Sequence, residues 1–233
     1  MGATAAQATR SNSLLAFHSK MLRDKPLGGV GGIIFTLFLF CGLFADFLAP
    51  YGMNETDMQR VLEAPSLAHW MGTDHIGRDV FSRILYGAQL SVIIGFLAAG
   101  LATMISIILG VLTGYFGGKV DMLIQRFVDA WMTFPDLVLL IVVVSIVGPS
   151  INQLIIILGC LYGIAGSRII RGSTIAVREN MYTHAAQSMG ATTLHIVWFH
   201  VLPNVMPVVI VLFTTRVGAV ILAEAGLSFL GLG

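Results

Sequence analysis

Long uncharged apolar runs constrain this chain more than any other feature. Residues 27–45 contain no Asp, Glu, Lys or Arg, and neither do residues 84–118. About 20 apolar residues cross a bilayer as an α-helix, because a helix satisfies its backbone hydrogen bonds internally. With 56% hydrophobic and 11% charged residues, the chain is expected to be all-α, a polytopic bundle of membrane helices.

The polar residues and turns divide the bundle into about five transmembrane helices. The first run is longer than the ~7–15-residue core of a signal peptide and no clear cleavage site follows it, so a membrane span is preferred to a cleaved signal. Residues 1–26 are expected to be an N-terminal tail and juxtamembrane segment, and residues 27–233 the transmembrane domain. The expected spans are residues 27–49, 91–114, 121–147, 151–167 and 203–223, with hydrophilic loops at 50–83 and 168–202.

Small residues and prolines shape two of these spans. Ser91, Gly95, Ala99 and Thr103 recur at every fourth position, a stripe that suits close packing against another helix. Pro135 lies inside the third span, where it is expected to kink or divide the helix.

Three charged residues in or next to the spans, Arg216, Asp129 and Glu224, are candidates for the lining of a translocation path. Arg216 would cost about 2.5–3.5 kcal/mol at a helix centre, so it is expected to face water or a partner. Contact with a substrate and an ion pair with Asp129 or Glu224 are both compatible with its position. For Asp129, an ion pair with Arg126, three residues earlier, is favoured over a proton relay.

The distribution of positive charge predicts the orientation. With a cytoplasmic N-terminus, nine basic residues lie inside and three outside, which satisfies the positive-inside rule. The loop at 50–83 is then extracytoplasmic and the loop at 168–202 cytoplasmic. The inner residues are Arg10, Lys20, Arg23, Lys25, Lys119, Arg126, Arg168, Arg171 and Arg178, and the outer ones are Arg60, Arg78 and Arg83.

A polar insert at residues 178–204 separates two apolar regions. Ala185 and Met189, and likewise Ala186 and Gly190, are four residues apart and are expected to share a helix face. Small side chains on that face would let another protein approach the backbone closely. Leu202-Pro203 is expected to end the helix and redirect the chain.

Catalytic and metal-binding signatures are missing from the sequence. Gly118-Lys119 is followed by Val120 where a phosphate loop needs Ser or Thr, so no nucleotide site is expected and the chain is not expected to be an enzyme. A net charge of +1 argues against nucleic acid as a partner. His69, Asp74 and His75 could in principle bind nickel, but a structural loop is favoured and no metal site is expected.

The polar insert resembles the cytoplasmic loop of binding-protein-dependent ABC importer permeases. That loop reads Glu-Ala-Ala, three residues, Gly, nine residues, an apolar residue, one residue and Leu-Pro. Two positions depart from it, because His184 replaces the glutamate and His200 the apolar residue. The positions that correspond to the motif are His184, Ala185, Ala186, Gly190, His200, Leu202 and Pro203.

Three further stretches, residues 69–83, 114–121 and 227–233, are similar to the C-type subunit of dipeptide, oligopeptide and nickel importers, and the resemblance covers roughly residues 14–233. It implies a bacterial inner-membrane subunit that pairs with a second homologous permease, two ABC ATPases and an extracytoplasmic substrate-binding protein. ATP and Mg²⁺ would bind to the ATPases, and no cofactor to this chain. Within residues 69–83 the motif positions are Gly72, Thr73, Asp74, Gly77, Arg78 and Asp79.

Three alternatives stay open at this stage. A nickel or other small-solute importer would share the same motifs, and an ATPase-independent channel would share the bundle. The family pattern also continues into a sixth helix beyond residue 233, so a short or truncated, inactive permease is the third alternative. Di- or oligopeptide import is the preferred interpretation.

Overall fold

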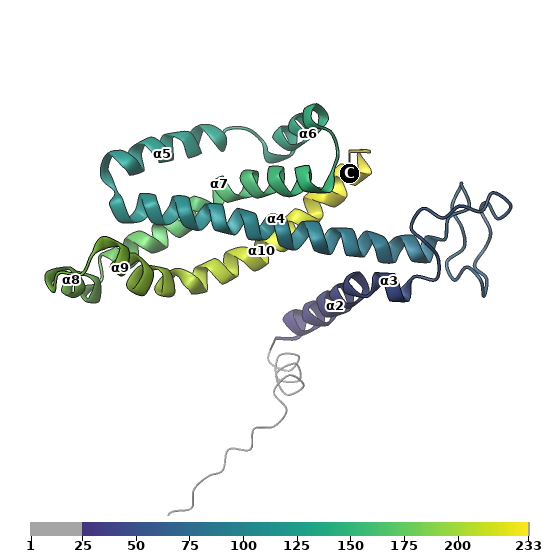
Figure 1. Ribbon diagram of the computed structural model, residues 1–233, viewed down its shortest axis with the longest axis horizontal. Coiled ribbons are helices and arrows are strands. Elements are labelled where there is room, and N and C mark those ends of the chain that lie inside the picture. Colours follow the sequence, from purple (N-terminus) through teal and green to yellow (C-terminus); the bar gives the residue numbers. More distant parts are fainter. Residues whose placement is uncertain (1–24, 233) are drawn as a thin grey trace, which may run out of the picture. The chain divides into compact units, whose positions relative to one another are not determined.

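The computed structural model describes residues 25–232, so the predicted N-terminal tail lies outside the described residues except for its last two positions (Figure 1). The chain forms two compact units, one ending at Leu90 and the other beginning at Ser91. Within the described residues every regular element is a helix.

The first unit contains a membrane-type helix, a long loop and the start of a second helix. Helix α2 (Pro26–Leu43) begins with a proline, whose missing N–H would have had no partner in the first turn. Its apolar residues lie on all sides and are mostly exposed, which is typical of a helix that faces lipid. Helix α3 (Ala45–Leu48) follows, and the loop at 49–79 leads into α4 (Val80–Phe116).

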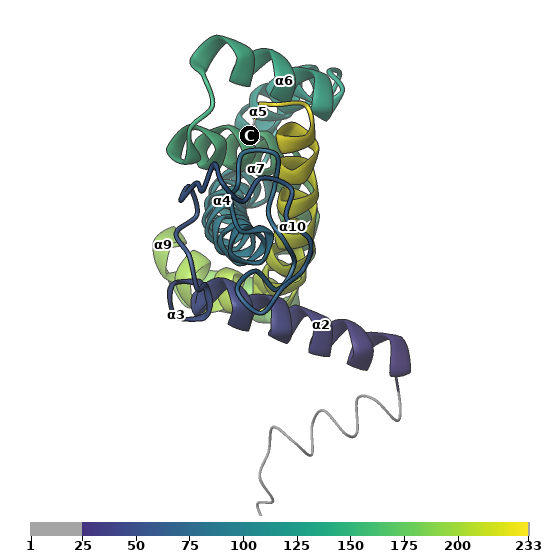
Figure 2. The same cartoon turned by 90° about the vertical axis from the view of Figure 1, so that its right-hand side faces the viewer.

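The second unit is a bundle built around α4 from Ser91 onward, α7 and α10, with α5 and α6 alongside α7 (Figures 1 and 2). Four helices of the described chain are long and apolar enough to span a membrane, or five if the bent pair α5–α6 counts as one span. The remaining elements are α5 (Gly118–Trp131), α6 (Asp136–Val147), α7 (Ile151–Arg178), α8 (Met181–Ser188), α9 (Thr193–Ile196), the π-helix η1 (Val197–Val201) and α10 (Leu202–Phe229).

Glycines allow α4 and α7 to pack closely. A Cβ atom at Gly163 of α7 would lie 2.8 Å from the Cβ of Ile105 and 3.0 Å from the Ala102 carbonyl oxygen. The reverse arrangement occurs at Gly110 of α4, where a Cβ would lie 2.6 Å from Ile170. The two backbones therefore approach each other over several turns.

The small-residue stripe of α4 packs as predicted. A Cβ at Gly95 would lie 2.9 Å from Ile221 of α10, and Ala99 is completely buried. Ser91 donates a hydrogen bond to Glu224, also on α10. The predicted close packing is confirmed for Gly95, and Ser91 and Gly95 contact the last helix.

The division at Pro135 is also confirmed. Helices α5 and α6 meet at an angle of 81°, and Pro135 is the residue immediately before α6. Helix α7, in contrast, continues to Arg178, well beyond the predicted end of its span at residue 167. Arg168 and Arg171 are consequently fixed on a helix and not in a loop.

Candidate functional site

The polar insert contains a short helix held at the end of α7. Thr183 is fully buried, and its hydroxyl donates a 2.9 Å hydrogen bond to the carbonyl of Val177. The Asn180 side-chain amide donates to the Ala176 carbonyl at 3.1 Å. These two bonds satisfy carbonyls near the end of α7 and fix the direction in which α8 leaves it.

Helix α8 ends at Gly190 in a Schellman motif. Gly190 has φ +83°, a left-handed conformation that L-residues other than glycine rarely adopt. Its N–H donates to the Gln187 carbonyl at 2.9 Å, and the Ala191 N–H donates to the Ala186 carbonyl at 3.1 Å. The sequence interpretation of Gly190 as a small residue on the helix face is wrong, because Gly190 lies beyond the helix and terminates it.

The two motif alanines have different environments. Ala186 is buried and packs in an apolar cluster with Val177, Ile196 and Val201. Ala185 is exposed, as are its neighbours His184 and Gln187. The proposal of a face of small residues therefore applies to Ala185 and not to Ala186, which holds α8 on the bundle.

Leu202-Pro203 does not end a helix, contrary to the sequence interpretation. Residues Thr193–Phe229 form one continuous helix, and η1 is a wider turn within it where the Leu202 N–H donates to the Val197 carbonyl, five residues back. Pro203 is tolerated because the π-turn lies directly before it. The Asn204 side chain donates to the His200 carbonyl at 2.6 Å, which satisfies a carbonyl in the altered turn.

Arg178 joins the polar insert to the end of α4. Its guanidinium donates to the carbonyls of Gly114 and Tyr115, at 3.3 and 3.2 Å, in the last turn of that helix. It also pairs with Glu179 at 2.8 Å, and Glu179 lies 4.0 Å from His184. A carboxylate is thus present beside position 184, although His184 replaces the motif glutamate.

Aromatic and sulfur-containing side chains are exposed in α8 and in the segment that follows it. The His200 ring is half-buried and lies 6.3 Å from Tyr182 and 6.1 Å from His195, between ring centroids. The large exposed apolar side chains nearby in sequence are Met181, Met189, Leu194, Trp198 and Phe199. Several large apolar side chains exposed in one segment are typical of a protein or membrane contact.

Ion pairs hold α5 against α7. Asp121 accepts two hydrogen bonds from Arg171, at 2.6 and 2.5 Å, and Asp129 pairs with Arg168. The expected pair of Asp129 with Arg126 is confirmed at 3.9 Å, but both partners are largely exposed and Arg168 is closer. The sequence did not predict the two α7 partners, since the predicted span ended before them.

Arg216 and Glu224 do not pair with each other. The Arg216 guanidinium carbon lies 5.0 Å from the centroid of the Tyr162 ring, in a cation–π arrangement. The Glu224 carboxylate accepts hydrogen bonds from the hydroxyls of Ser91 and Ser228, both at 3.0 Å. Within the described residues neither charge has an ionic partner, so the ion pair considered for Arg216 is not formed with Asp129 or Glu224.

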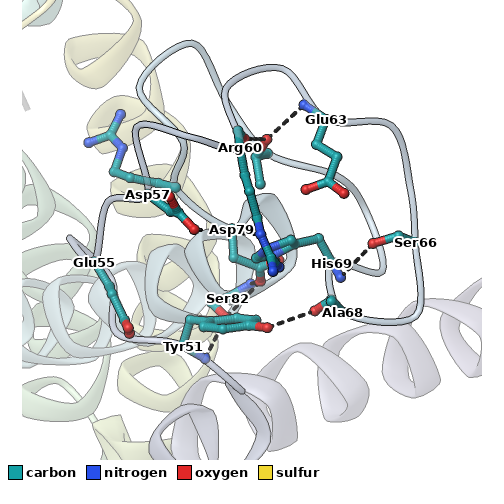
Figure 3. A network of polar contacts seen from close by, with 12 residues as sticks. Tyr51, Glu55, Asp57, Arg60, Glu63, Ser66, Ala68, His69, Asp79 and Ser82 are labelled. Carbon is teal, nitrogen blue, oxygen red and sulfur yellow. Dashed lines mark hydrogen bonds and ion pairs between the residues drawn. The ribbon is translucent and has the colours of Figure 1, made fainter.

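The loop at 49–79 is organised around a buried histidine–aspartate pair (Figure 3). His69 Nδ1 lies 2.9 Å from Asp79, the two side chains are almost fully buried, and the Tyr51 ring stacks on the imidazole. Asp79 accepts hydrogen bonds from the Ser82 N–H and hydroxyl, and so caps α4. Burial opposes ionisation of Asp79, but the bonds from Ser82 and His69 outweigh it and lower the pKa of this carboxyl.

The motif residues of this loop have structural roles. Asp74 accepts hydrogen bonds from the side chains of Arg78 and Arg83, both at 2.7 Å, and from two backbone N–H groups. Burial opposes ionisation of the carboxylate, but the bonds from the Arg78 and Ile76 N–H groups and from the Arg78 guanidinium outweigh burial and hold the pKa of Asp74 well below its usual range. The Thr73 hydroxyl bonds with the backbone of Arg60 and Glu63.

Gly72 and Gly77 have φ values of +74° and +78°. A side chain at either position would collide with a backbone carbonyl, of Glu63 and Asp57 respectively. Glycine is therefore required at both positions.

A polar cavity of about 430 Å³ opens in the same loop. His69 and Asp79 form its buried side, and the carboxylates of Glu55 and Asp57 lie with Arg60 at its exposed side. His69, Asp74 and His75 do not converge, because His69 pairs with Asp79. No group of three His, Cys, Asp or Glu suited to a metal occurs in residues 25–232.

Comparison with known sequences settles the family. Residues 106–233 match the family described as binding-protein-dependent transport system inner membrane component. This chain belongs to that permease family. Residues 18–65 of the permease also match the N-terminal transmembrane domain of oligopeptide transport permease C.

Three relatives support the same assignment. The permease is 39% identical to the dipeptide transport system permease protein DppC of Alkalihalophilus pseudofirmus, over 92% of this chain and 70% of the relative. It is 37% identical to the probable D,D-dipeptide transport system permease protein DdpC of Escherichia coli, over 91% and 72% of the two chains. The glutathione transport system permease protein GsiD of Pectobacterium atrosepticum is also 37% identical, over 87% and 67%.

The family and the apolar helices together define the class of protein. The permease is a multi-pass inner-membrane protein and a transport subunit, not an enzyme. It works within a binding-protein-dependent importer that contains other subunits.

Proposed function

We propose that the permease forms half of the translocation path of an importer for di- or oligopeptides, together with a second homologous permease. Two ABC ATPases bind the ATP and Mg²⁺ that drive transport, and an extracytoplasmic binding protein delivers the substrate. The names of the relatives, which mention dipeptides and glutathione, a tripeptide, favour peptides over nickel as the substrate.

The observation that carries the coupling role is the exposed helix α8. It projects from the bundle between α7 and α10, it is terminated by Gly190, and it is anchored by buried Thr183 and Ala186. A force applied to α8 would therefore pass to α7 through Thr183 and to α4 through Arg178. Exposed Ala185 offers an ATPase close access to the helix backbone.

The loop at 49–79 is proposed as the docking surface for the binding protein. Its cavity has charged groups of both signs at its exposed side, and buried hydrogen bonds make the loop rigid. A preorganised loop loses little conformational entropy on docking. This placement requires a cytoplasmic N-terminus, as the positive charges predict.

The coupling role can be tested with one exposed alanine. Ala185→Arg places a long charged side chain on the proposed contact face, and we expect co-purification of the ATPase subunits and ATP-driven peptide uptake to fall by about tenfold or more. Ala64→Arg makes the same change at an exposed alanine of the loop at 49–79 and is the matched control for co-purification. Normal ATPase recovery with Ala185→Arg would contradict the proposal.

A further inference from the structure

Helix α10 carries two ionisable groups of opposite sign that are kept apart. Arg216 and Glu224 are eight residues apart, which corresponds to about 12 Å along a helix and about 80° around it. A helix is too stiff to bring such groups into contact. The two charges therefore cannot neutralise each other within this chain.

Within the described residues, the hydrogen bonds of the Glu224 carboxylate come from neutral hydroxyl groups. Two serine hydroxyls, from Ser91 on α4 and Ser228 on α10, donate to its two oxygens and leave lone pairs available. These bonds orient the carboxylate without cancelling its charge. An ammonium group is the complementary ligand.

An aromatic ring orients the Arg216 guanidinium. Tyr162 of α7 lies against it at 5.0 Å, and the side chain is half-buried. Asp136, in the first turn of α6, forms no ion pair with Arg216 within the described residues. The planar guanidinium retains its capacity for a bidentate bond to a carboxylate.

Charged groups in a membrane helix are costly, and they mark pathways for polar substrates when they are not paired. A peptide with free termini carries an ammonium at one end and a carboxylate at the other. An extended chain covers about 3.3–3.6 Å per residue, so a spacing of roughly 12 Å suits peptides of about two to four residues, given the reach of the two side chains.

We propose that Arg216, supported by Tyr162, binds the C-terminal carboxylate of a short peptide during translocation, and that Glu224, oriented by Ser91 and Ser228, binds its N-terminal ammonium group. This inference rests on the proposed peptide-import function. It adds a requirement for both free termini and an upper limit to the length of the preferred peptide.

The test uses three peptides that differ only at their ends. The complete importer is reconstituted in liposomes with its binding protein, and uptake is measured for trialanine, trialanine amide and N-acetyl-trialanine. Binding of each peptide to the binding protein is measured separately. Uptake by each variant is then divided by wild-type uptake of the same peptide, so that the contribution of the binding protein cancels.

Each variant should lose the preference for one free terminus of the peptide and keep the other. Arg216→Gln is expected to lower uptake of trialanine and its N-acetyl form by about tenfold and to leave uptake of the amide nearly unchanged, as for loss of one charged hydrogen-bonded contact. Glu224→Gln should lower uptake of trialanine and the amide, and leave the N-acetyl form nearly unchanged. Arg216→Lys, which keeps the charge, should retain part of the preference.

The results distinguish failure of this inference from failure of the proposed function. An equal loss of all three peptides in Arg216→Gln would overturn the inference and indicate a structural role or an ion pair with the second permease. If Arg216→Gln does not assemble, Tyr162→Leu replaces it. An equal loss of uptake of all three peptides in Tyr162→Leu would likewise overturn the inference. Failure of the wild-type importer to take up any peptide would instead refute the proposed function.

Discussion

Three neighbouring small residues of the polar insert have three different roles. Ala185 is exposed, Ala186 fills a buried position, and Gly190 supplies the left-handed conformation that ends α8. Spacing alone places Ala186 and Gly190 on one helix face and pairs Ala185 with Met189 on another. The difference arises because burial depends on the packing of α8 against Ile196 and Val201, which lie later in the chain.

Gly190→Ala is expected to destabilise the end of α8 by about 1–2 kcal/mol, the cost of a left-handed L-residue. No atom lies within 4 Å of the added Cβ, so the cost is conformational and not steric. The midpoint of thermal unfolding of the purified permease measures it. Gly190→Asn should cost less, because asparagine tolerates this conformation, and equal stability of the Ala and Gly proteins would contradict the prediction.

Asp79 is expected to make stability depend on acid pH. Its pKa in the folded protein is lowered, so its contribution is complete above about pH 5 and is lost progressively as the pH falls below the unfolded value of about 3.9 toward the folded one. Thermal unfolding of wild type and Asp79→Asn between pH 6 and 3 tests this. The stability advantage of the wild type should shrink as the pH falls, and a constant difference would exclude the linkage.

The helices of the second unit differ in how they achieve contact. Helices α4 and α7 use glycines, whereas α5 is attached to α7 by Asp121–Arg171 and Asp129–Arg168 ion pairs. Glycine contacts need the two backbones at a fixed short distance, whereas ion pairs on long side chains tolerate small shifts. The α4–α7 pair is therefore the more rigid part of the bundle.

Two glycines of α7 should respond oppositely to alanine. Gly163→Ala forces a Cβ to within 2.8 Å of Ile105 and is expected to destabilise the permease by about 1–3 kcal/mol. Gly172→Ala has no atom within 4 Å of its Cβ and should be neutral or stabilising by up to about 1 kcal/mol, because alanine is the better helix former. Unfolding midpoints of the two variants measure the difference, and similar values would argue against close packing at Gly163.

The whole molecule is organised by its position in a membrane. The polar insert and the loop at 49–79 are the two hydrophilic parts of the described chain that carry family motifs, and the proposed mechanism requires them on opposite sides. The positive charges predict this arrangement, and it requires the bent pair α5–α6 to cross the membrane as one span.

Cysteine labelling tests this topology. Ser188 and Leu67 are exposed, and each can be replaced by cysteine in a protein whose Cys41 and Cys160 are changed to alanine. With a membrane-impermeant maleimide, Leu67→Cys is expected to react in cells with a permeabilised outer membrane, and Ser188→Cys only after the inner membrane is opened. Reaction of Ser188→Cys from outside would reverse the proposed orientation.

The sequence by itself determined the properties that depend on composition and local spacing. Uncharged runs predict the spans because a bilayer excludes unpaired charge and backbone, and Pro135 predicts a break because it lacks an N–H. The motif of the polar insert identifies the family through residues that lie close together in the chain. The length of α7 past residue 167 was not predicted, because Arg168 and Arg171 look like loop residues until their partners are known.

Only the tertiary structure decided which residues meet. His69 pairs with Asp79 and not with Asp74, Arg216 faces Tyr162 and not an acid, and Leu202-Pro203 continues a helix through the π-turn before it. Each outcome depends on the positions of groups on other elements or on the backbone geometry of the preceding turn. Local sequence limits these choices, but the packing of distant segments selects among them.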